Sequence, residues 1–150
     1  MADRVQFELV TPERLLLSEM VEMVVVPGTE GNFGVLPGHA PLISSIRPGM
    51  IDVYEGQTIT RRIFVVSGIA EVTAERCTVL ADEALPPEEL DRGGIEAELQ
   101  TIEGNLPSLR EQIGRASGTD REALLVELRR LERQQNVLQA KLQALSEIAR

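Results

Sequence analysis

The first half of the chain alternates apolar and polar residues in short runs that turn residues separate. Val5, Phe7 and Leu9 alternate with polar neighbours before Thr11-Pro12, which is typical of a strand with one buried face. Such runs recur up to Asp82, too short and too frequent for strand-helix-strand units. We therefore predict an antiparallel β-sandwich of about eight to ten short strands. The expected strands include residues 5–9, 15–17, 21–26, 42–46, 50–54, 58–66, 69–73 and 77–81, and loss of alternation after Glu22 predicts that the later part of 21–26 is covered on both faces.

The periodicity changes at Pro86-Pro87, where we place the boundary between domains of residues 1–86 and 87–150. Beyond it, apolar residues recur at spacings of four and three, the stripe of a helix that packs on another helix. Two stripes predict an antiparallel helical hairpin, and the whole chain is therefore α+β by content. Gly104 and Pro107 interrupt the first stripe, so we predict a kink or a break there. The stripes are Ile95, Leu99, Ile102, Leu106, Leu109 and Ile113, then Leu124, Leu128, Leu131, Gln135, Leu138, Leu142, Leu145 and Ala149.

The composition argues against several classes of function. The net charge is −9, with one lysine, which argues against nucleic acid as a partner because a nucleic-acid binder shows a basic face. The chain begins without a signal peptide and contains no run of 18 apolar residues, so we expect a cytoplasmic chain with no direct membrane insertion. One cysteine and one histidine offer no metal cluster or catalytic set. We expect Cys77 to be a buried structural thiol, His39 to make a turn hydrogen bond, and the protein not to be an enzyme.

The segment 26–42 holds four glycines and three prolines among seventeen residues, which predicts a shaped loop on the β scaffold. Its order of residues, with Pro27-Gly28, Glu30-Gly31, Gly34-Val35 and the run PGHAPL at 37–42, resembles the signature of the epsilon subunit of the F-type rotary ATP synthase. Three further motifs resemble that family in the correct order: RPGMI at 47–51, SGIAEV at 67–72 and VLADEA at 79–84. The resemblance covers essentially the whole chain.

The resemblance implies a non-catalytic rotor subunit in the central stalk of a proton-translocating synthase. It would couple ion-driven rotation of the membrane c-ring to ATP synthesis in the catalytic head, and it would sit peripherally at the cytoplasmic face of the bacterial inner membrane. The residues implied to face the c-ring and the gamma subunit are Thr29, Glu30, Gly31, Asn32, Phe33, Gly38, His39 and Pro41.

The family also uses its hairpin as a brake on ATP hydrolysis, and this implies contacts with the catalytic head when the hairpin is extended. We expect Arg129, Arg130 and Arg133 to make those contacts. Some members bind ATP through Ile/Leu-Asp-x-x-Arg-Ala, of which this chain keeps Leu90 and Asp91, with Arg92 nearby. Gly94 and Ile95 replace the motif's Arg and Ala, so we expect weak ATP binding or none, and no cofactor.

Two hypotheses from other classes compete with the rotor subunit. In one, a free-standing ligand-binding β-sandwich presents the segment 26–42, and the hairpin forms a dimerising coiled coil. A symmetric homodimer in solution would favour it, whereas co-purification with membranes and a gamma-type partner would favour the rotor. In the other, a small enzyme is centred on His39, but no nucleophile or second base lies near it in the sequence.

Overall fold

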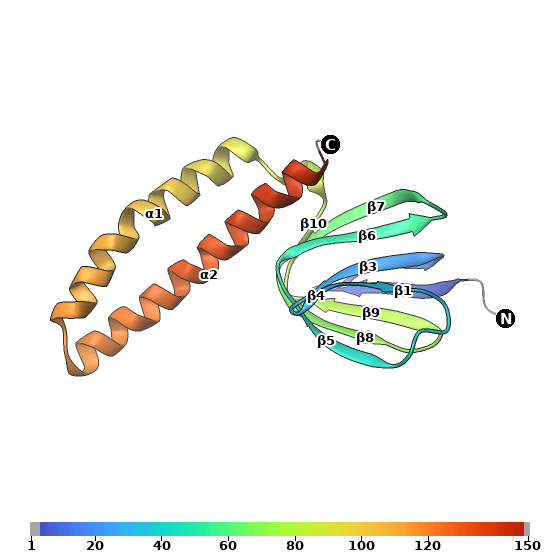
Figure 1. Cartoon of the computed structure of the whole chain (residues 1–150), viewed down its shortest axis with the longest axis horizontal. Coiled ribbons are helices and arrows are strands. Elements are labelled where there is room, and N and C mark those ends of the chain that lie inside the picture. Colours follow the sequence, from blue (N-terminus) through green and yellow to red (C-terminus); the bar gives the residue numbers. More distant parts are fainter. Residues whose placement is uncertain (1–3, 149–150) are drawn as a thin grey trace. The chain divides into compact units, whose positions relative to one another are not determined.

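The chain folds into two compact units, Met1–Glu89 and Leu90–Arg150. The computed structural model describes residues 4–148. The first unit is a β-sandwich and the second a helical hairpin (Figure 1). The boundary after Glu89 lies slightly beyond the predicted one at Pro86-Pro87, because the short strand β10 and the 3-10 turn η1 still belong to the sandwich: β10 pairs with β7, and η1 contacts β7.

Ten strands form the described part of the first unit, at the upper end of the predicted range. The predicted loop segment 26–42 contains the end of one strand and the whole of another, β4, so about half of it is regular structure. The strands are β1 Val5–Val10, β2 Leu15–Val21, β3 Met23–Gly28, β4 Gly31–Val35, β5 Leu42–Ile46, β6 Gly49–Glu55, β7 Thr58–Val65, β8 Gly68–Val72, β9 Arg76–Ala81 and β10 Ala84–Leu85.

The strands form one curled sheet in the order β10-β7-β6-β3-β5-β8-β9-β1-β2, and β4 pairs with β3 off this path. Neighbouring strands of the described chain pair antiparallel, as predicted, with the exception of β1 and β9, which run parallel from Gln6↔Arg76 to Val10↔Leu80. Most of the domain separates these two strands in the sequence, so no hairpin dictates their direction and the closure of the sandwich decides it.

The core of the sandwich is mostly aliphatic, with Phe7 and Phe64 as its largest fully buried side chains. Phe7, Leu9 and Phe64 are essentially without solvent exposure, and each such side chain contributes about 1.5–3 kcal/mol relative to an exposed one. The predicted double coverage of the later part of 21–26 is wrong for most of it, because Val25 is half-buried between the buried Val24 and Val26; burial in succession begins only at Val26 and continues through Pro27 and Gly28. The sheet therefore holds the start of the segment 26–42 on both faces.

The second unit is an antiparallel helical hairpin. The 3-10 turn η1, Pro87–Glu89, precedes α1, Arg92–Arg115, and two residues connect α1 to α2, Gly118–Ile148. An ion pair between Arg110 and Glu132 (Nη2 to Oε2, 3.6 Å) crosses between the helices. Members of both predicted stripes are buried, whereas Ala149 lies outside the described residues. The buried residues are Ile95, Ile102, Leu106, Leu109, Ile113, Leu131, Leu138 and Ala144.

Of the kink or break predicted at Pro107, the break is wrong, because α1 runs without interruption from Arg92 to Arg115 with Pro107 inside it. Pro107 cannot donate to the carbonyl of Glu103. Both residues are exposed, so water can satisfy that carbonyl at little cost. Packing of the flanking Leu106 and Leu109, both buried, holds the helix together across the weak point.

Candidate functional site

The turn between β3 and β4 forms a tip, which we define as residues 28–32; Gly28 at its base is buried, and residues 29–32 are exposed. Gly28 pairs with Gly31 across the hairpin, and Thr29 and Glu30 make the two-residue turn between them. Gly31 adopts a φ of +135°, a conformation that an L side chain would strain. The tip therefore presents one carboxylate, that of Glu30, on a closely defined backbone.

The base of the tip is tightly packed. A Cβ at Gly28 would lie 2.9 Å from the carbonyl oxygen of Gly31 and 2.9 Å from Cε1 of Phe33, so only glycine fits there. The backbone N–H of Thr29 donates to Ser45 O at 3.0 Å, which ties the tip to β5. Phe33 thus packs on the hairpin itself and is half-buried.

Arg47, in the linker between β5 and β6, reaches both arms of the tip. Its Nη1 donates to Gly28 O at 2.6 Å and its Nη2 to Asn32 Oδ1 at 2.5 Å, while its backbone N–H donates to Pro27 O at 3.0 Å. The sequence placed Arg47 in a family motif without assigning it a role. Its contacts depend on a strand pairing, Gly28↔Ile46, that local pattern does not show.

The predicted contact residues Gly38, His39 and Pro41 lie in the loop 36–41. The Gly38 N–H donates to Ala74 O at 2.8 Å, and His39 hydrogen-bonds with the Ala40 carbonyl through Nδ1 at 2.6 Å. The predicted turn hydrogen bond of His39 is thereby confirmed. This loop is consequently tied to the turn between β8 and β9.

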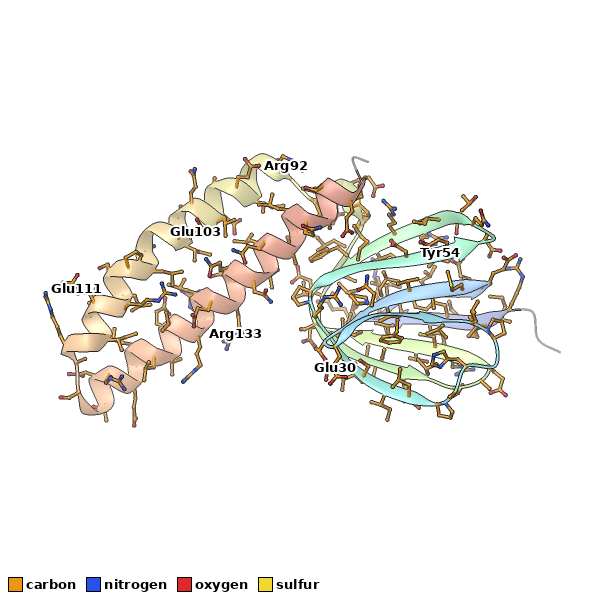
Figure 2. The ribbon with its side chains drawn as sticks, in the orientation of Figure 1. Glu30, Tyr54, Arg92, Glu103, Glu111 and Arg133 are labelled. Carbon is orange, nitrogen blue, oxygen red and sulfur yellow. The ribbon has the colours of Figure 1, made fainter. Side chains whose placement is uncertain are left out.

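The tip and the loop 36–41 lie at opposite ends of the strands. β5 begins at Leu42, which pairs with Val72, and ends at Ile46, which pairs with Gly28. Figure 2 shows Glu30 at one end of the sandwich and Tyr54, the partner of Met23 at the start of β3, at the other. The eight predicted contact residues therefore make two separate surfaces and not one.

The three predicted inhibitory arginines on α2 differ in their surroundings. Arg130 is held by Glu127 through two hydrogen bonds of 2.6 and 2.9 Å, and these bonds lower the pKa of Glu127 and raise the pKa of Arg130. Arg129 and Arg133 are exposed one turn apart, and no ion pair forms on either within residues 4–148. The charge available to a partner is therefore that of Arg129 and Arg133.

The residues predicted for nucleotide contacts, Leu90, Asp91 and Arg92, lie at the start of α1. Arg92 Nη1 already pairs with Glu96 Oε1 at 3.5 Å. The carboxylate of Asp91 lies over the start of α1, where a Cβ at Gly94 would come within 2.7 Å of Asp91 Oδ2. Leu90 is buried. A phosphate approaching this helix start would meet a negative charge in place of the missing arginine.

The thiol of Cys77 is buried, and this burial raises its pKa to about 12, so the predicted structural thiol is confirmed. In the part of the chain that the structure describes, no group of three or more His, Cys, Asp or Glu side chains could hold a metal ion. Within residues 4–148, neither α1 nor α2 combines the length and the apolar character that a membrane-spanning helix needs.

The fold is thus a small β-sandwich with exposed turns, followed by a helical hairpin, and the sandwich is the part that assigns the chain to a class of ATP synthase chains. Residues 4–87 match the family described as ATP synthase, Delta/Epsilon chain, beta-sandwich domain. The chain belongs to this family, and the resemblance of its motifs to the epsilon subunit is confirmed. As a chain of the epsilon type it is a rotor subunit, and the free-standing dimeric module is not favoured.

Curated relatives named ATP synthase epsilon chain match most of the length of this chain. The chain is 51% identical over 124 residues to the ATP synthase epsilon chain of Rhodospirillum rubrum, covering 83% of this chain and 92% of the relative. It is 41% identical over 129 residues to that of Parvibaculum lavamentivorans, covering 86% and 98%. A chain of the Euglena gracilis mitochondrial ATP synthase, solved as OSCP/F1/c-ring, shares the fold with a TM-score of 0.71 at 22% identity, covering 97% of this chain and 83% of that one.

Proposed function

We propose that the chain is a non-catalytic rotor subunit whose sandwich meets two partners at two separate places. The observation that carries this proposal is the exposed tip, which a buried, mostly aliphatic core and the Arg47 contacts hold in one shape. A joint that transmits torque needs stiffness, and the Arg47 hydrogen bonds together with the buried core support that role for the tip. The Euglena assembly whose chain shares this fold contains a c-ring together with F1, the kind of neighbour that such a joint requires.

The tip and the loop 36–41 suit different partners. The tip is polar, with Glu30 and Asn32 exposed, and it suits the polar loops of the c-ring. The other end presents Leu36, 54% exposed, and Leu42, 37% exposed, beside His39, and apolar side chains of this kind favour burial against a protein surface. We assign this second end to the gamma subunit. Both contacts would hold the chain peripherally at the cytoplasmic face of the bacterial inner membrane.

The hairpin is proposed as the regulatory part. When the hairpin is extended, Arg129 and Arg133 would meet acidic groups of the catalytic head. Arg130 is already hydrogen-bonded to Glu127. ATP is not proposed as a ligand, since the Arg92 guanidinium is paired with Glu96 and the Asp91 carboxylate occupies the helix start. Titration of the isolated chain with ATP tests this point, and tight binding would overturn it.

The contact with the ring is tested by Glu30→Gln. The side chain is exposed, so the free energy of unfolding should change by less than about 0.5 kcal/mol. Binding to membranes carrying ATP synthase depleted of its own epsilon chain should weaken, together with ATP-driven proton pumping. Glu98→Gln, the same change at an exposed position of α1, is the matched control and should bind as the unmodified chain does. Failure of the unmodified chain to bind at all would refute the proposed function.

A further inference from the structure

One guanidinium joins both arms of the tip to the linker that follows β5. Gly28, whose carbonyl accepts from Arg47 Nη1, ends β3, whereas Asn32, whose Oδ1 accepts from Nη2, lies on β4. Both donors belong to one planar group, so the two acceptors cannot move apart without breaking a bond. Because charge-assisted hydrogen bonds are among the stronger contacts of a protein surface, this contact restrains the width of the hairpin at its turn.

The same residue also fixes the tip to the sandwich through its backbone. The Arg47 N–H donates to Pro27 O, and the Thr29 N–H donates to Ser45 O on the neighbouring strand, each at 3.0 Å. Backbone bonds thus hold the β3 arm, whereas the guanidinium reaches over to the exposed β4 arm at Asn32. Arg47 is half-buried, and its bond to the Gly28 carbonyl is partly screened from water, whereas its bond to Asn32 is exposed.

We propose that Arg47 is a positioning residue, which fixes the tip in the shape that presents Glu30 to the partner surface. This inference rests on the proposed function, because it assigns to the tip the contact with the ring. It follows that position 47 needs the two separate N–H donors of the guanidinium, Nη1 and Nη2, and not only a positive charge. A lysine at the same position keeps the charge but offers a single ammonium to two acceptors that face it from different strands.

Hydrogen exchange of the full-length chain tests the restraint. The reporter is the Thr29 amide, bonded to Ser45 O, and the internal reference is the Gly38 amide, bonded to Ala74 O at the far end of the strands. In Arg47→Met and Arg47→Lys the Thr29 amide should exchange about tenfold faster while the Gly38 amide is unchanged. Asn32→Ala, which removes one acceptor and leaves the arginine, should give an increase of about threefold.

The matched control is Arg61→Met, because Arg61 is an exposed arginine of β7 that pairs with Glu19 at 3.2 Å. It should leave the Thr29 amide unchanged. The same variants are then bound to the epsilon-depleted synthase in membranes. We expect Arg47→Met and Arg47→Lys to bind more weakly than Asn32→Ala, and Asn32→Ala more weakly than the unmodified chain, with the control binding normally.

Each outcome decides a different point. An unchanged Thr29 amide in Arg47→Met would show that the guanidinium does not restrain the tip, and wild-type behaviour of Arg47→Lys would show that charge alone suffices. Faster exchange with undiminished binding would show that the order of the tip does not matter to the partner. Any of these overturns the inference. Absence of binding by the unmodified chain would instead refute the proposed function and leave the exchange result standing.

Discussion

The weakest stretch of the hairpin lies in the middle of α1, where Gly104 and Pro107 occupy exposed positions of a continuous helix. Glycine loses more backbone entropy than alanine on entering a helix, and proline removes one hydrogen bond. We predict that the double variant Gly104→Ala/Pro107→Ala makes the hairpin harder to open. The change adds no group to the buried seam, so its effect is confined to the backbone of α1.

The gain in stability of α1 can be estimated from the surroundings of the two substituted positions. A Cβ at Gly104 meets nothing within 4 Å, so alanine should gain the full difference in helix propensity, about 1 kcal/mol. Alanine at position 107 restores the donor for the Glu103 carbonyl and removes the clash of the ring, worth up to about 3 kcal/mol. Water at the exposed Glu103 recovers part of that cost already, so we expect about 1–3 kcal/mol from this second change. Together the changes should lower the open population roughly 30-fold or more.

Hydrogen exchange of the full-length chain measures this opening, because it separates the amides of α1 from those of the sandwich. The α1 amides should exchange more slowly in the double variant, while strands such as β9 stay unchanged. Gln100→Ala is the control: this side chain is exposed on the same helix, and its propensity differs little from that of alanine. If the amides near Leu106 exchange as fast as before, opening does not pass through this stretch and the reasoning fails.

Three further predictions concern other parts of the chain. A chain of residues 1–89 should melt as one cooperative β unit, since it keeps every strand together with η1, and a molten product in circular dichroism would contradict this. Arg129→Ala/Arg133→Ala should relieve inhibition of ATP hydrolysis in the reconstituted enzyme more than Arg130→Ala does, because Glu127 already holds Arg130; equal effects would refute the difference. The pKa of the Cys77 thiol rises from 9.0 to about 12 on folding, so between these values the thiol ionises in the unfolded chain and not in the folded one. Chemical denaturation should therefore show the free energy of unfolding falling by about 1.4 kcal/mol per pH unit above pH 9. Cys77→Ala should abolish this slope.

Some features of this protein follow from neighbouring residues alone. The alternation of Val5, Phe7 and Leu9 predicts a strand because one face of it must be buried, and those three side chains are buried. The four-three spacing of the second half predicts two packed helices for the same reason. The residue order of the segment 26–42 predicted the family, which the match over residues 4–87 confirms.

Where local propensity and packing disagree, packing decided the outcome. Gly93 and Gly94 disfavour a helix, yet α1 begins at Arg92 and includes both. Pro107 predicted a kink or a break, and no break forms, because the buried stripe on either side of it carries the helix through. Propensities amount to about 1–3 kcal/mol at such positions, whereas the seam buries several aliphatic side chains that are each worth a similar amount.

The candidate site shows the same division between sequence and structure. The sequence indicated which residues form exposed turns, because glycine and proline act on their own backbone. Only strand pairing decided that residues 28–32 and 36–41 lie at opposite ends of β5, and that Arg47 meets Gly28 and Asn32. The side chain of Arg47 meets partners 15 and 19 positions away through the register of three strands, and register is a property of the whole closed sheet rather than of any segment of the sequence.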